Sequence, residues 1–230
     1  MIQVDALIIG AGPIGGYLAK KLCQAGYTVL MIEEHNQIGR PFQCAGLVNP
    51  GSMEKVGLES TALTRIWGAR IHGPGGTLVE IGSPERTRTW SVCRKLFDEA
   101  VVAQAISAGG SLMLNSTPKG TSISEEYVVT TISTDNTELT VKSKVVLGCD
   151  GAHSWVRRYH RMGRVRETMI GFQIDVTGYL HKEGKLDMYT GQQIAPGFFA
   201  WAIPTGTTTR IGTFSRPDLL GGKSCLLYTS

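Results

Sequence analysis

The chain has 230 residues, of which 42% are hydrophobic and 18% charged, and its 23 Lys and Arg against 19 Asp and Glu leave a net charge of +4. This length is enough for one large or two small domains with a hydrophobic core, and so mild a charge gives no ground for a nucleic-acid-binding role. Five cysteines without a CxxC pair indicate a reduced, cytoplasmic protein without a metal site, and since there is no signal-peptide pattern and no apolar run near ~20 residues, we expect membrane contact to be peripheral at most.

The N-terminal residues predict a β-α-β unit. Ala6 to Ile9 form a short apolar run that ends in glycine, as a buried parallel strand does, and apolar residues then recur at helical spacing until Gly26. Residues 29 to 32 form a second apolar strand, which Glu33 follows. Together these elements have the size expected of this unit. The stretch from 36 to 57 is rich in glycine, proline and polar residues, and we interpret it as a long irregular connection.

The rest of the chain predicts short strands around one further helix. The helix covers 94 to 108, where apolar residues recur at helical spacing before a Gly-Gly pair. Strands are predicted at 65–72, 77–81, 87–92, 112–114, 127–132, 139–141, 145–147, 172–179, 198–203 and 209–214. The last residues, 219 to 230, carry no helix or strand pattern, and we interpret them as a non-native tail on a C-terminally truncated chain.

The turn between the first strand and the first helix has the spacing of a dinucleotide site. It reads GxGxxG, with Pro13 inside the pattern formed by Gly10, Gly12 and Gly15. The first glycine permits a sharp turn, the second lets the main chain approach a diphosphate, and the third lets the helix pack close to the sheet. Glu33 ends the second strand, where a carboxylate can accept hydrogen bonds from the ribose of an adenosine. Strand, helix, strand and terminal acid together predict dinucleotide binding.

Two later segments resemble the flavoprotein group that includes aromatic hydroxylases, halogenases and geranylgeranyl reductases, and the likeness covers nearly all of residues 4 to 215. Arg94 precedes a helix and resembles an arginine that contacts the flavin in that group. Asp150 and Gly151 resemble its second signature, in which the aspartate lies near the diphosphate and the ribityl chain. This resemblance implies that the cofactor is FAD. Alternatively, Asp150 caps a helix that starts near His153, and both roles can coexist.

The segment that begins at Pro41 resembles the geranylgeranyl reductases within this group. Those proteins carry a cysteine close to the isoalloxazine ring, and Cys44, followed by Ala45 and Gly46, matches that position. The resemblance implies that these three residues contact the cofactor and that the Cys44 thiol helps to shape the reaction pocket or relays a proton. A buried, inert cysteine is the alternative.

The strand that ends at Pro204 resembles the substrate-side strand of geranylgeranyl reductases, which reads PxxYxWxFP. Pro196, Trp201 and Pro204 match, whereas Phe199 replaces the tyrosine and so removes a phenol proton donor. Because side chains alternate along a strand, Phe199, Trp201 and Ile203 share one face, where they can form an apolar wall against a polyisoprenoid chain. An ordinary core strand would have the same pattern.

Arginines crowd one short stretch after the second signature. They are Arg157, Arg158, Arg161, Arg164 and Arg166. A solvated basic face is one interpretation. The other is a docking patch for phosphate on a lipid head group, an anionic membrane surface or a nicotinamide dinucleotide, and the sequence does not separate these three.

The resemblance implies an α/β fold with a Rossmann-like, discontinuous FAD-binding domain, as in para-hydroxybenzoate hydroxylase, and a β-sheet substrate domain. We expect the FAD-binding domain to cover 1–59 and 93–167 and the substrate domain to cover 60–92 and 168–218. The implied activity is that of the archaeal digeranylgeranylglycerophospholipid reductases, in which reduced flavin delivers a hydride to an isoprenoid double bond of a prenyl lipid. The electron donor, a reduced nicotinamide or ferredoxin, stays open, as does the oligomeric state.

Two other functions fit the same residues. An aromatic monooxygenase or a halogenase would share the flavin signatures. The stretch from Phe199 to Pro204 differs at one residue from the WxWxIP motif of tryptophan halogenases. The halogenase lysine has no convincing counterpart, because Lys55 is poorly placed. The third flavin signature of the group is absent from these residues, so an inactive fragment is the remaining alternative.

Overall fold

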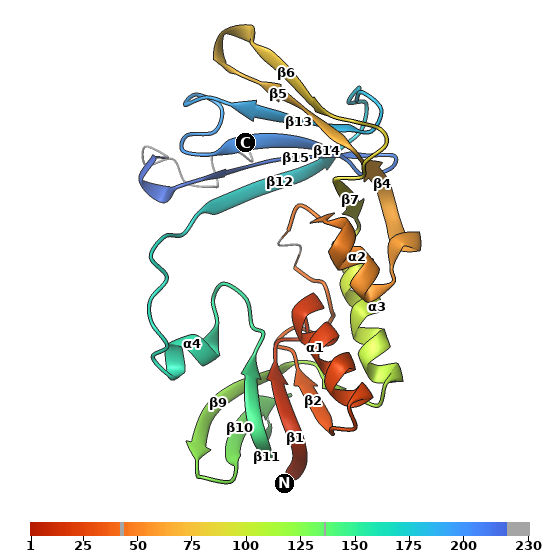
Figure 1. Ribbon diagram of the computed structural model, residues 1–230. Helices are drawn as coiled ribbons and strands as arrows, with labels where there is room; N and C mark the ends of the chain where they lie inside the picture. Colours follow the sequence, from red (N-terminus) through yellow and green to blue (C-terminus); the bar gives the residue numbers. More distant parts are fainter. Residues whose placement is uncertain (42–43, 136, 220–230) are drawn as a thin grey trace. The chain divides into compact units, whose positions relative to one another are not determined.

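A computed structural model describes residues 1–41, 44–135 and 137–219. The chain divides into two compact units, each assembled from two stretches of sequence. Unit 1 consists of Met1–Gln43 and Arg94–Arg164, and unit 2 of Cys44–Cys93 and Val165–Ser230. In Figure 1 the elements of unit 1 include α1, α3 and β1, and those of unit 2 include α2, β5 and β14.

Unit 1 is built on a six-stranded sheet in the order β8-β2-β1-β11-β10-β9. The first four of these strands run parallel to one another, and β10 and β9 continue the sheet as antiparallel neighbours. The strands are β1 (Ile2–Ile9), β2 (Val29–Ile32), β8 (Ser111–Met113), β9 (Ser116–Ile123), β10 (Val128–Thr134) and β11 (Thr137–Gly148). The helices are α1 (Pro13–Gln24), α3 (Arg94–Ser107) and the short α4 (Trp155–Tyr159).

Both faces of the unit 1 sheet are buried, which explains why its central strands are continuous apolar runs rather than alternating ones. Ile8 and Met31 pack on one face with Val102 of α3 and with α1. Leu7 and Ile32 pack on the other face with residues that include Val156 of α4. The pairing of β1 with both β2 and β11 places the ends of three strands at one edge of the sheet, where the turn after β1 begins.

Unit 2 contains a second six-stranded sheet, in the order β12-β15-β14-β13-β5-β6, and a three-stranded sheet in the order β3-β7-β4. The larger sheet is antiparallel except where β13 pairs with β5. Its strands are β5 (Gly68–His72), β6 (Leu78–Gly82), β12 (Ile170–Val176), β13 (Lys185–Thr190), β14 (Phe199–Pro204) and β15 (Thr209–Ser215). The smaller sheet has β3 (Leu47–Val48), β4 (Ala62–Ile66) and β7 (Thr89–Val92), and α2 covers Pro50–Val56.

Two predicted elements were wrong in unit 2. The stretch from 36 to 57 is not wholly irregular, because α2 begins at Pro50, after Asn49, whose side chain accepts a hydrogen bond from the Ser52 amide, and ends before a left-handed Gly57. Proline at the first position, an asparagine cap and a glycine stop are helix signals that we interpreted as a loop. The single strand predicted over 65–72 is two strands in different sheets.

The observed elements differ from the predicted ones at three further places. β9 and β13 were not predicted, because their sequences are polar and lack an apolar run. β11 is one strand of 12 residues where two short ones were predicted. By contacts, residues 44 to 59 belong to unit 2, whereas we predicted them in the FAD-binding domain, and the other divisions fall at 93/94 and 164/165.

The predicted tail, 219 to 230, lies outside the described residues except for Leu219. No helix among the described residues is long and apolar enough to span a bilayer.

Candidate functional site

The glycines of the first turn lie where any side chain would meet the main chain. Gly10 follows β1 with φ +97°, and a Cβ atom there would lie 2.5 Å from the carbonyl oxygen of Cys149. A Cβ atom on Gly15 would overlap the carbonyl oxygen of Gly10. At Gly12, by contrast, the space that a Cβ would occupy holds no atom within 4 Å. The turn is therefore tightly packed on the protein side and open at the glycine that was predicted to face a diphosphate.

The N-terminus of α1 begins at this turn. Gly12 is the capping residue and Pro13 occupies the first turn, and no side chain caps this end. The Gly12 carbonyl accepts the first helical hydrogen bond, from Gly16 at 2.9 Å. Amide groups at the start of a helix carry partial positive charge and attract phosphate. The twelve residues of α1 thus offer an uncapped, positively polarised end beside the open position at Gly12.

Glu33 lies against the same turn, as its position at the end of β2 predicts. Its Oε2 atom accepts a hydrogen bond from the Ala11 amide at 3.0 Å, and its side chain is only 14% exposed. Its Oε1 atom lies 2.6 Å from Nδ1 of His35. His35 was not predicted, and only its position two residues after the terminal acid could have indicated it. Oε1 also accepts a hydrogen bond from the His35 amide at 3.3 Å. These contacts fix both oxygens of the carboxylate, and Oε2 keeps a further lone pair for an outside hydroxyl donor.

Glu33, Glu34 and His35 offer ligand atoms within 4.8 Å of one another. Glu34 is 68% exposed, however, and Glu33 already contacts Ala11 and His35. Exposed acidic groups of this kind are common, so this cluster does not alter the prediction that the chain has no metal site.

The second signature lies directly beside the first turn because β11 pairs with β1. The Cys149 amide donates to the Ile9 carbonyl at 2.7 Å, and the Cα atom of Asp150 would lie 2.9 Å from a Cβ on Gly10. Burial raises the pKa of the Cys149 thiol, and the Asp150 carboxylate raises it further. The two glycine-containing turns, about 140 residues apart in sequence, therefore form one edge of unit 1.

Asp150 caps α4, which is the structural role that we weighed for it. Its Oδ2 atom accepts a hydrogen bond from the Val156 amide at 3.1 Å, and Ser154 caps the same helix through the Arg157 amide. Gly151 has φ +68° and open space around the position of a Cβ. The predicted contact of Asp150 with the cofactor stays a prediction, since the carboxylate retains capacity for a second partner.

Arg94 is the first residue of α3 and forms a two-pronged ion pair within its own helix. Its Nε and Nη2 atoms lie 2.9 Å from the two carboxylate oxygens of Asp98. Burial raises the pKa of Asp98, and the pair with Arg94 opposes this rise. The pairing holds the guanidinium in one orientation at the start of the helix. Its contact with a flavin remains a prediction.

Cys44, Ala45 and Gly46 belong to unit 2 and are held by three separate strands. Gln173 of β12 donates to the Cys44 carbonyl at 3.3 Å, and Arg210 of β15 donates to the Ala45 carbonyl at 3.0 Å. The Gly46 carbonyl accepts from the amide of residue 92 in β7. Phe42 and Gln43, also part of the predicted motif, lie outside the described residues. The main chain around the candidate thiol is thus fixed, whereas its sulfur accepts only a long bond of 3.5 Å from the Gly46 amide.

Arg210 was missed by the sequence interpretation, although it supports this motif. It is 4% exposed and pairs with both carboxylate oxygens of Asp175, at 2.9 and 3.0 Å. A planar guanidinium suits such two-pronged pairing and leaves a further donor, which reaches Ala45. Nothing in its local sequence separates it from a surface arginine at a strand edge.

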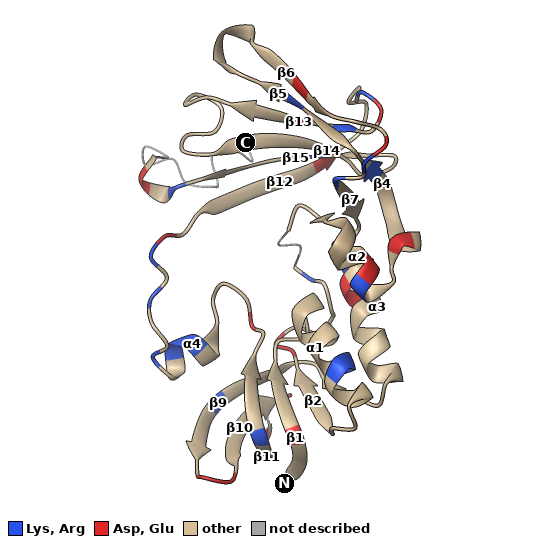
Figure 2. Ribbon diagram, viewed as in Figure 1, with Lys and Arg blue, Asp and Glu red and all other residues tan. Residues whose placement is uncertain are grey.

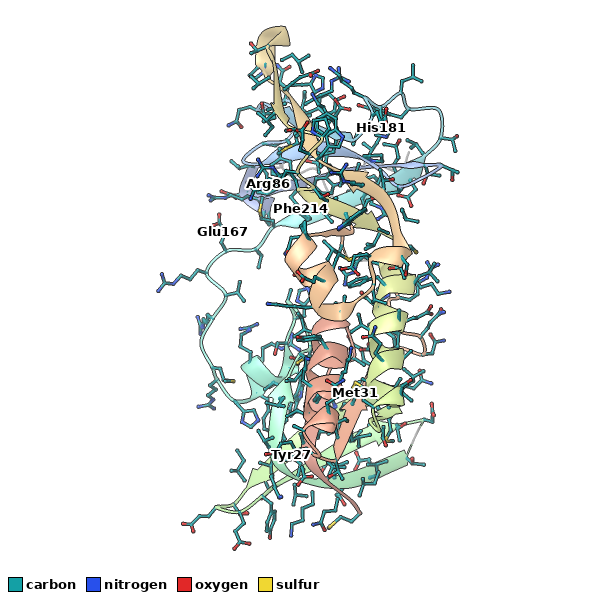
Figure 3. The ribbon with its side chains drawn as sticks, turned by 45° about the vertical axis from the view of Figure 1, so that its right-hand side comes forward. Tyr27, Met31, Arg86, Glu167, His181 and Phe214 are labelled. Carbon is teal, nitrogen blue, oxygen red and sulfur yellow. The ribbon has the colours of Figure 1, made fainter. Side chains whose placement is uncertain are left out.

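Phe199, Trp201 and Ile203 share one face of β14, as their alternation predicts. Trp201 and Ile203 are 5% and 1% exposed and form the core of unit 2 with Ile66 and others, and Phe199 packs against that core. The ring centroid of Phe214, which is labelled in Figure 3, lies 4.9 Å from the ring centroid of Trp201. The structure therefore gives Trp201 and Ile203 the role of core residues, and Phe199 is the half-buried member of the predicted wall. Ala45 packs on the same core, which brings the Cys44 segment and this strand together.

The opposite face of the same sheet carries a polar cluster that the sequence did not reveal. Asp187 of β13 is 1% exposed and accepts from Nε2 of His72 at 2.7 Å and from the Tyr179 hydroxyl at 3.1 Å. Tyr179 also lies 2.6 Å from the hydroxyl of Tyr189. Burial and these acidic and phenolic neighbours raise the pKa of Tyr179. Because Asp187 pairs in register with Ala202, it lies on the face away from Trp201.

Comparison with known proteins places the chain in a family. The model of the FAD binding domain matches residues 3–203. A digeranylgeranylglycerophospholipid reductase of Methanosarcina acetivorans is 31% identical over 213 residues, which cover 88% of this chain and 52% of that protein. The chain thus spans about half the length of this curated relative.

Solved structures agree with this assignment. A geranylgeranyl bacteriochlorophyll reductase-like protein of Thermoplasma acidophilum superposes with a TM-score of 0.84 and 25% identity, over 95% of this chain and 58% of that one. A p-nitrophenol 4-monooxygenase of Pseudomonas putida gives a TM-score of 0.77 at 17% identity, over 100% of this chain and 61% of that one, which shows a shared fold alone. The predicted fold class is confirmed. The chain belongs to the FAD-binding domain family, and its cofactor is FAD.

Proposed function

We propose that this chain is the FAD-binding part of a reductase that saturates isoprenoid double bonds of prenyl lipids. The observation that carries the proposal is the 31% identity, over 88% of the chain, with a protein named for reduction of a digeranylgeranyl lipid. The aromatic strand that ends at Pro204 supports the same substrate class, because Pro196, Trp201 and Pro204 match the substrate-side motif of geranylgeranyl reductases.

The residues of unit 1 fit an FAD molecule. The open position at Gly12 and the uncapped start of α1 provide room and positive polarisation for a diphosphate. Glu33 would accept hydrogen bonds from the ribose of the adenosine half, with its carboxylate oriented by Ala11 and His35. Pro13 would fix the start of the helix, and Gly10 and Gly15 would keep the turn free of side chains. Arg94, Asp150 and Gly151 would contact the flavin half.

When bound, FAD supplies the hydride chemistry that no side chain can provide. The protein's own part is to orient the substrate and exclude water. Phe199 would present a half-buried apolar surface to a polyisoprenoid chain, and Trp201 would hold that surface from the core behind it. The fixed main chain of Cys44, Ala45 and Gly46 would face the isoalloxazine ring, and the thiol of Cys44 would shape the pocket or pass a proton. Because residue 199 is a phenylalanine, this strand has no tyrosine hydroxyl that could donate a proton.

Turnover by the full-length protein tests the proposal. The purified enzyme, chemically reduced without oxygen, is mixed with a geranylgeranyl lipid, and mass spectrometry follows the gain of two hydrogens per saturated bond. Saturation in the natural protein and its loss in a Phe199→Asp variant that still binds FAD are the expected results. Full FAD binding with untouched double bonds contradicts the proposal, and flavin absorbance of the purified 230-residue chain separates such a result from a failure to bind cofactor.

The competing function is an oxygen-using flavoprotein. It is the second candidate because the chain shares its fold with p-nitrophenol 4-monooxygenase and because the stretch from Phe199 to Pro204 resembles a halogenase motif. The same assay run in air with aromatic substrates and halide distinguishes the two. Oxygenated or halogenated products favour this second candidate over the reductase.

A further inference from the structure

The part of unit 1 after the second signature concentrates positive charge without any nearby acid in sequence. We call residues 153 to 164 the arginine segment; it contains α4 and the turn that follows it. No aspartate or glutamate occurs between Asp150 and Glu167, and four of the segment's twelve residues are arginines. Figure 2 shows this charge as blue on α4 and in the chain that leads from it. The proposed reductase mechanism gives these arginines no task.

One side of the segment is fastened to the sheet of unit 1. Val156 packs against Gly148 at the end of β11, so closely that a Cβ on that glycine would lie 2.9 Å from it. The hydroxyl of Tyr159 accepts from the Thr121 amide, and His160 contacts the Thr121 hydroxyl, both at 3.3 Å. Because these three anchors recur at helical spacing, they define the inward side of α4.

The opposite side of the segment faces outward and carries the arginines. Arg158 and Arg161, three residues apart, are exposed, and Arg164 is exposed after the turn. Arg157 holds the turn closed by donating to the Gly163 carbonyl at 3.1 Å. Met162, between the outward arginines, is 68% exposed. The segment therefore presents guanidinium groups around an exposed apolar side chain on a fixed support.

These guanidinium groups lack the carboxylate partners that several other cations of the protein have. Arg94, Arg210 and Lys185 each have a carboxylate partner at 2.9 Å or less. Among the described residues, no carboxylate lies within ion-pair distance of Arg158, Arg161 or Arg164. Unpaired guanidinium groups beside exposed apolar atoms favour a flat anionic surface over a simple solvated face. At a lipid surface the guanidinium groups find phosphates to bind, and the apolar atoms are removed from water.

We propose that the arginine segment docks the chain on an anionic phospholipid bilayer. Guanidinium forks would bind lipid phosphates, and Met162 would enter the boundary between head groups and acyl chains. Each cation close to such a surface strengthens binding about 5-fold, so three arginines contribute about 100-fold. Binding to a bilayer is measurable without turnover, and it therefore stands or falls separately from the proposed reductase activity.

Vesicle sedimentation with the full 230-residue chain tests this docking. One set of vesicles contains phosphatidylglycerol mixed with phosphatidylcholine, and the other phosphatidylcholine alone. We expect binding to the first set only, and about 100-fold weaker partitioning for a variant with Arg158→Gln, Arg161→Gln and Arg164→Gln. The matched control removes three exposed cations from unit 2, by Lys55→Gln, Arg86→Gln and Arg88→Gln, and should keep most of the binding. A Met162→Ser variant should lose binding to a smaller extent.

Three outcomes overturn the proposal. The first is no binding to the phosphatidylglycerol vesicles. The second is an equal loss in the arginine-segment variant and in the matched control, which would show that net charge alone matters. The third is displacement by inorganic phosphate at constant ionic strength, which would show that the arginines bind a free phosphate rather than a bilayer. Circular dichroism of each variant confirms that these exposed substitutions leave the fold intact.

Discussion

The two units provide their candidate ligand contacts by different means. In unit 1 the candidate FAD contacts come mainly from main-chain groups and from glycines that leave space, such as Gly12. In unit 2 the candidate substrate contacts come from aromatic side chains, such as Phe199, whose positions depend on a packed core. A site made from main chain tolerates no added atoms, whereas a site made from side chains tolerates little loss of them. The following substitutions test this contrast, from the largest expected effect to the smallest.

Trp201→Ala should destabilise unit 2 the most. The ring is 5% exposed and packs against Phe214, and its removal leaves a cavity that should cost about 4 kcal/mol of unfolding free energy. Thermal unfolding followed by near-ultraviolet circular dichroism measures the change. Phe198→Ala, at a side chain 39% exposed, is the matched control and should cost much less. Equal losses in the two variants would show that the Trp201 cluster is not the core of this unit.

Gly15→Ala should affect unit 1 by adding a single atom. The new Cβ would overlap the Gly10 carbonyl, and relieving this overlap should cost about 3 kcal/mol and distort the turn. Purified protein should therefore contain little FAD, as measured by its absorbance. Gly12→Ala meets no protein atom within 4 Å and should leave stability near that of the natural chain while it weakens FAD binding. Full FAD content in the Gly12→Ala variant would show that the diphosphate does not bind beside this residue.

Glu33→Gln should weaken FAD binding by about 2 kcal/mol, or about 30-fold in Kd, because a charge-assisted hydrogen bond to the ribose is replaced by a neutral one. The variant keeps the size of the side chain, so stability should change less than affinity. Titration with FAD measures the change. Glu34→Gln, at a side chain 68% exposed, serves as the control and should bind FAD normally. Similar affinities in the two variants would contradict the role of Glu33.

Glu80→Gln should change how the stability of unit 2 depends on pH. Hydrogen bonds from Lys182 and Lys185 lower the pKa of Glu80 from 4.5 to about 2. A carboxylate with a lowered pKa in the folded state contributes stability above pH 4.5, and this contribution is lost as the pH falls from 4.5 to about 2. The variant should therefore show a smaller fall in melting temperature over that interval. Glu85→Gln, at an exposed acid, should keep the natural pH profile.

The sequence predicted unit 1 in more detail than unit 2. The turn at Gly10 and the acid at Glu33 are local features whose spacing has one geometric meaning once a strand precedes them and a helix follows. Buried parallel strands are apolar throughout, so β1 and β2 were recognisable without their neighbours. The position of Cys149 beside Gly10 followed from the resemblance rather than from any local pattern.

In unit 2 the features that depend on partners distant in sequence could not be predicted. β13 was not predicted because Lys185 and Asp187 are polar, and only the structure shows that Glu80 and His72 satisfy them. The Arg210 contact with Ala45 joins residues 165 positions apart, and no periodicity encodes it. The burial of Trp201 was likewise undecided, since a core strand and an apolar wall have the same alternation. Partners far apart in sequence are therefore what single-sequence reasoning lacks here.

The order of strands in unit 1 has a consequence for how the nascent protein acquires its structure. β1 lies between β2, which follows it closely, and β11, which ends at Gly148. The strand made first cannot complete its pairing until the whole of the inserted stretch Cys44–Cys93 has been synthesised. During translation at about 5–20 residues per second, the apolar β1 therefore waits several seconds for its last neighbour. During this interval the edge of β1 that later pairs with β11 has no partner strand.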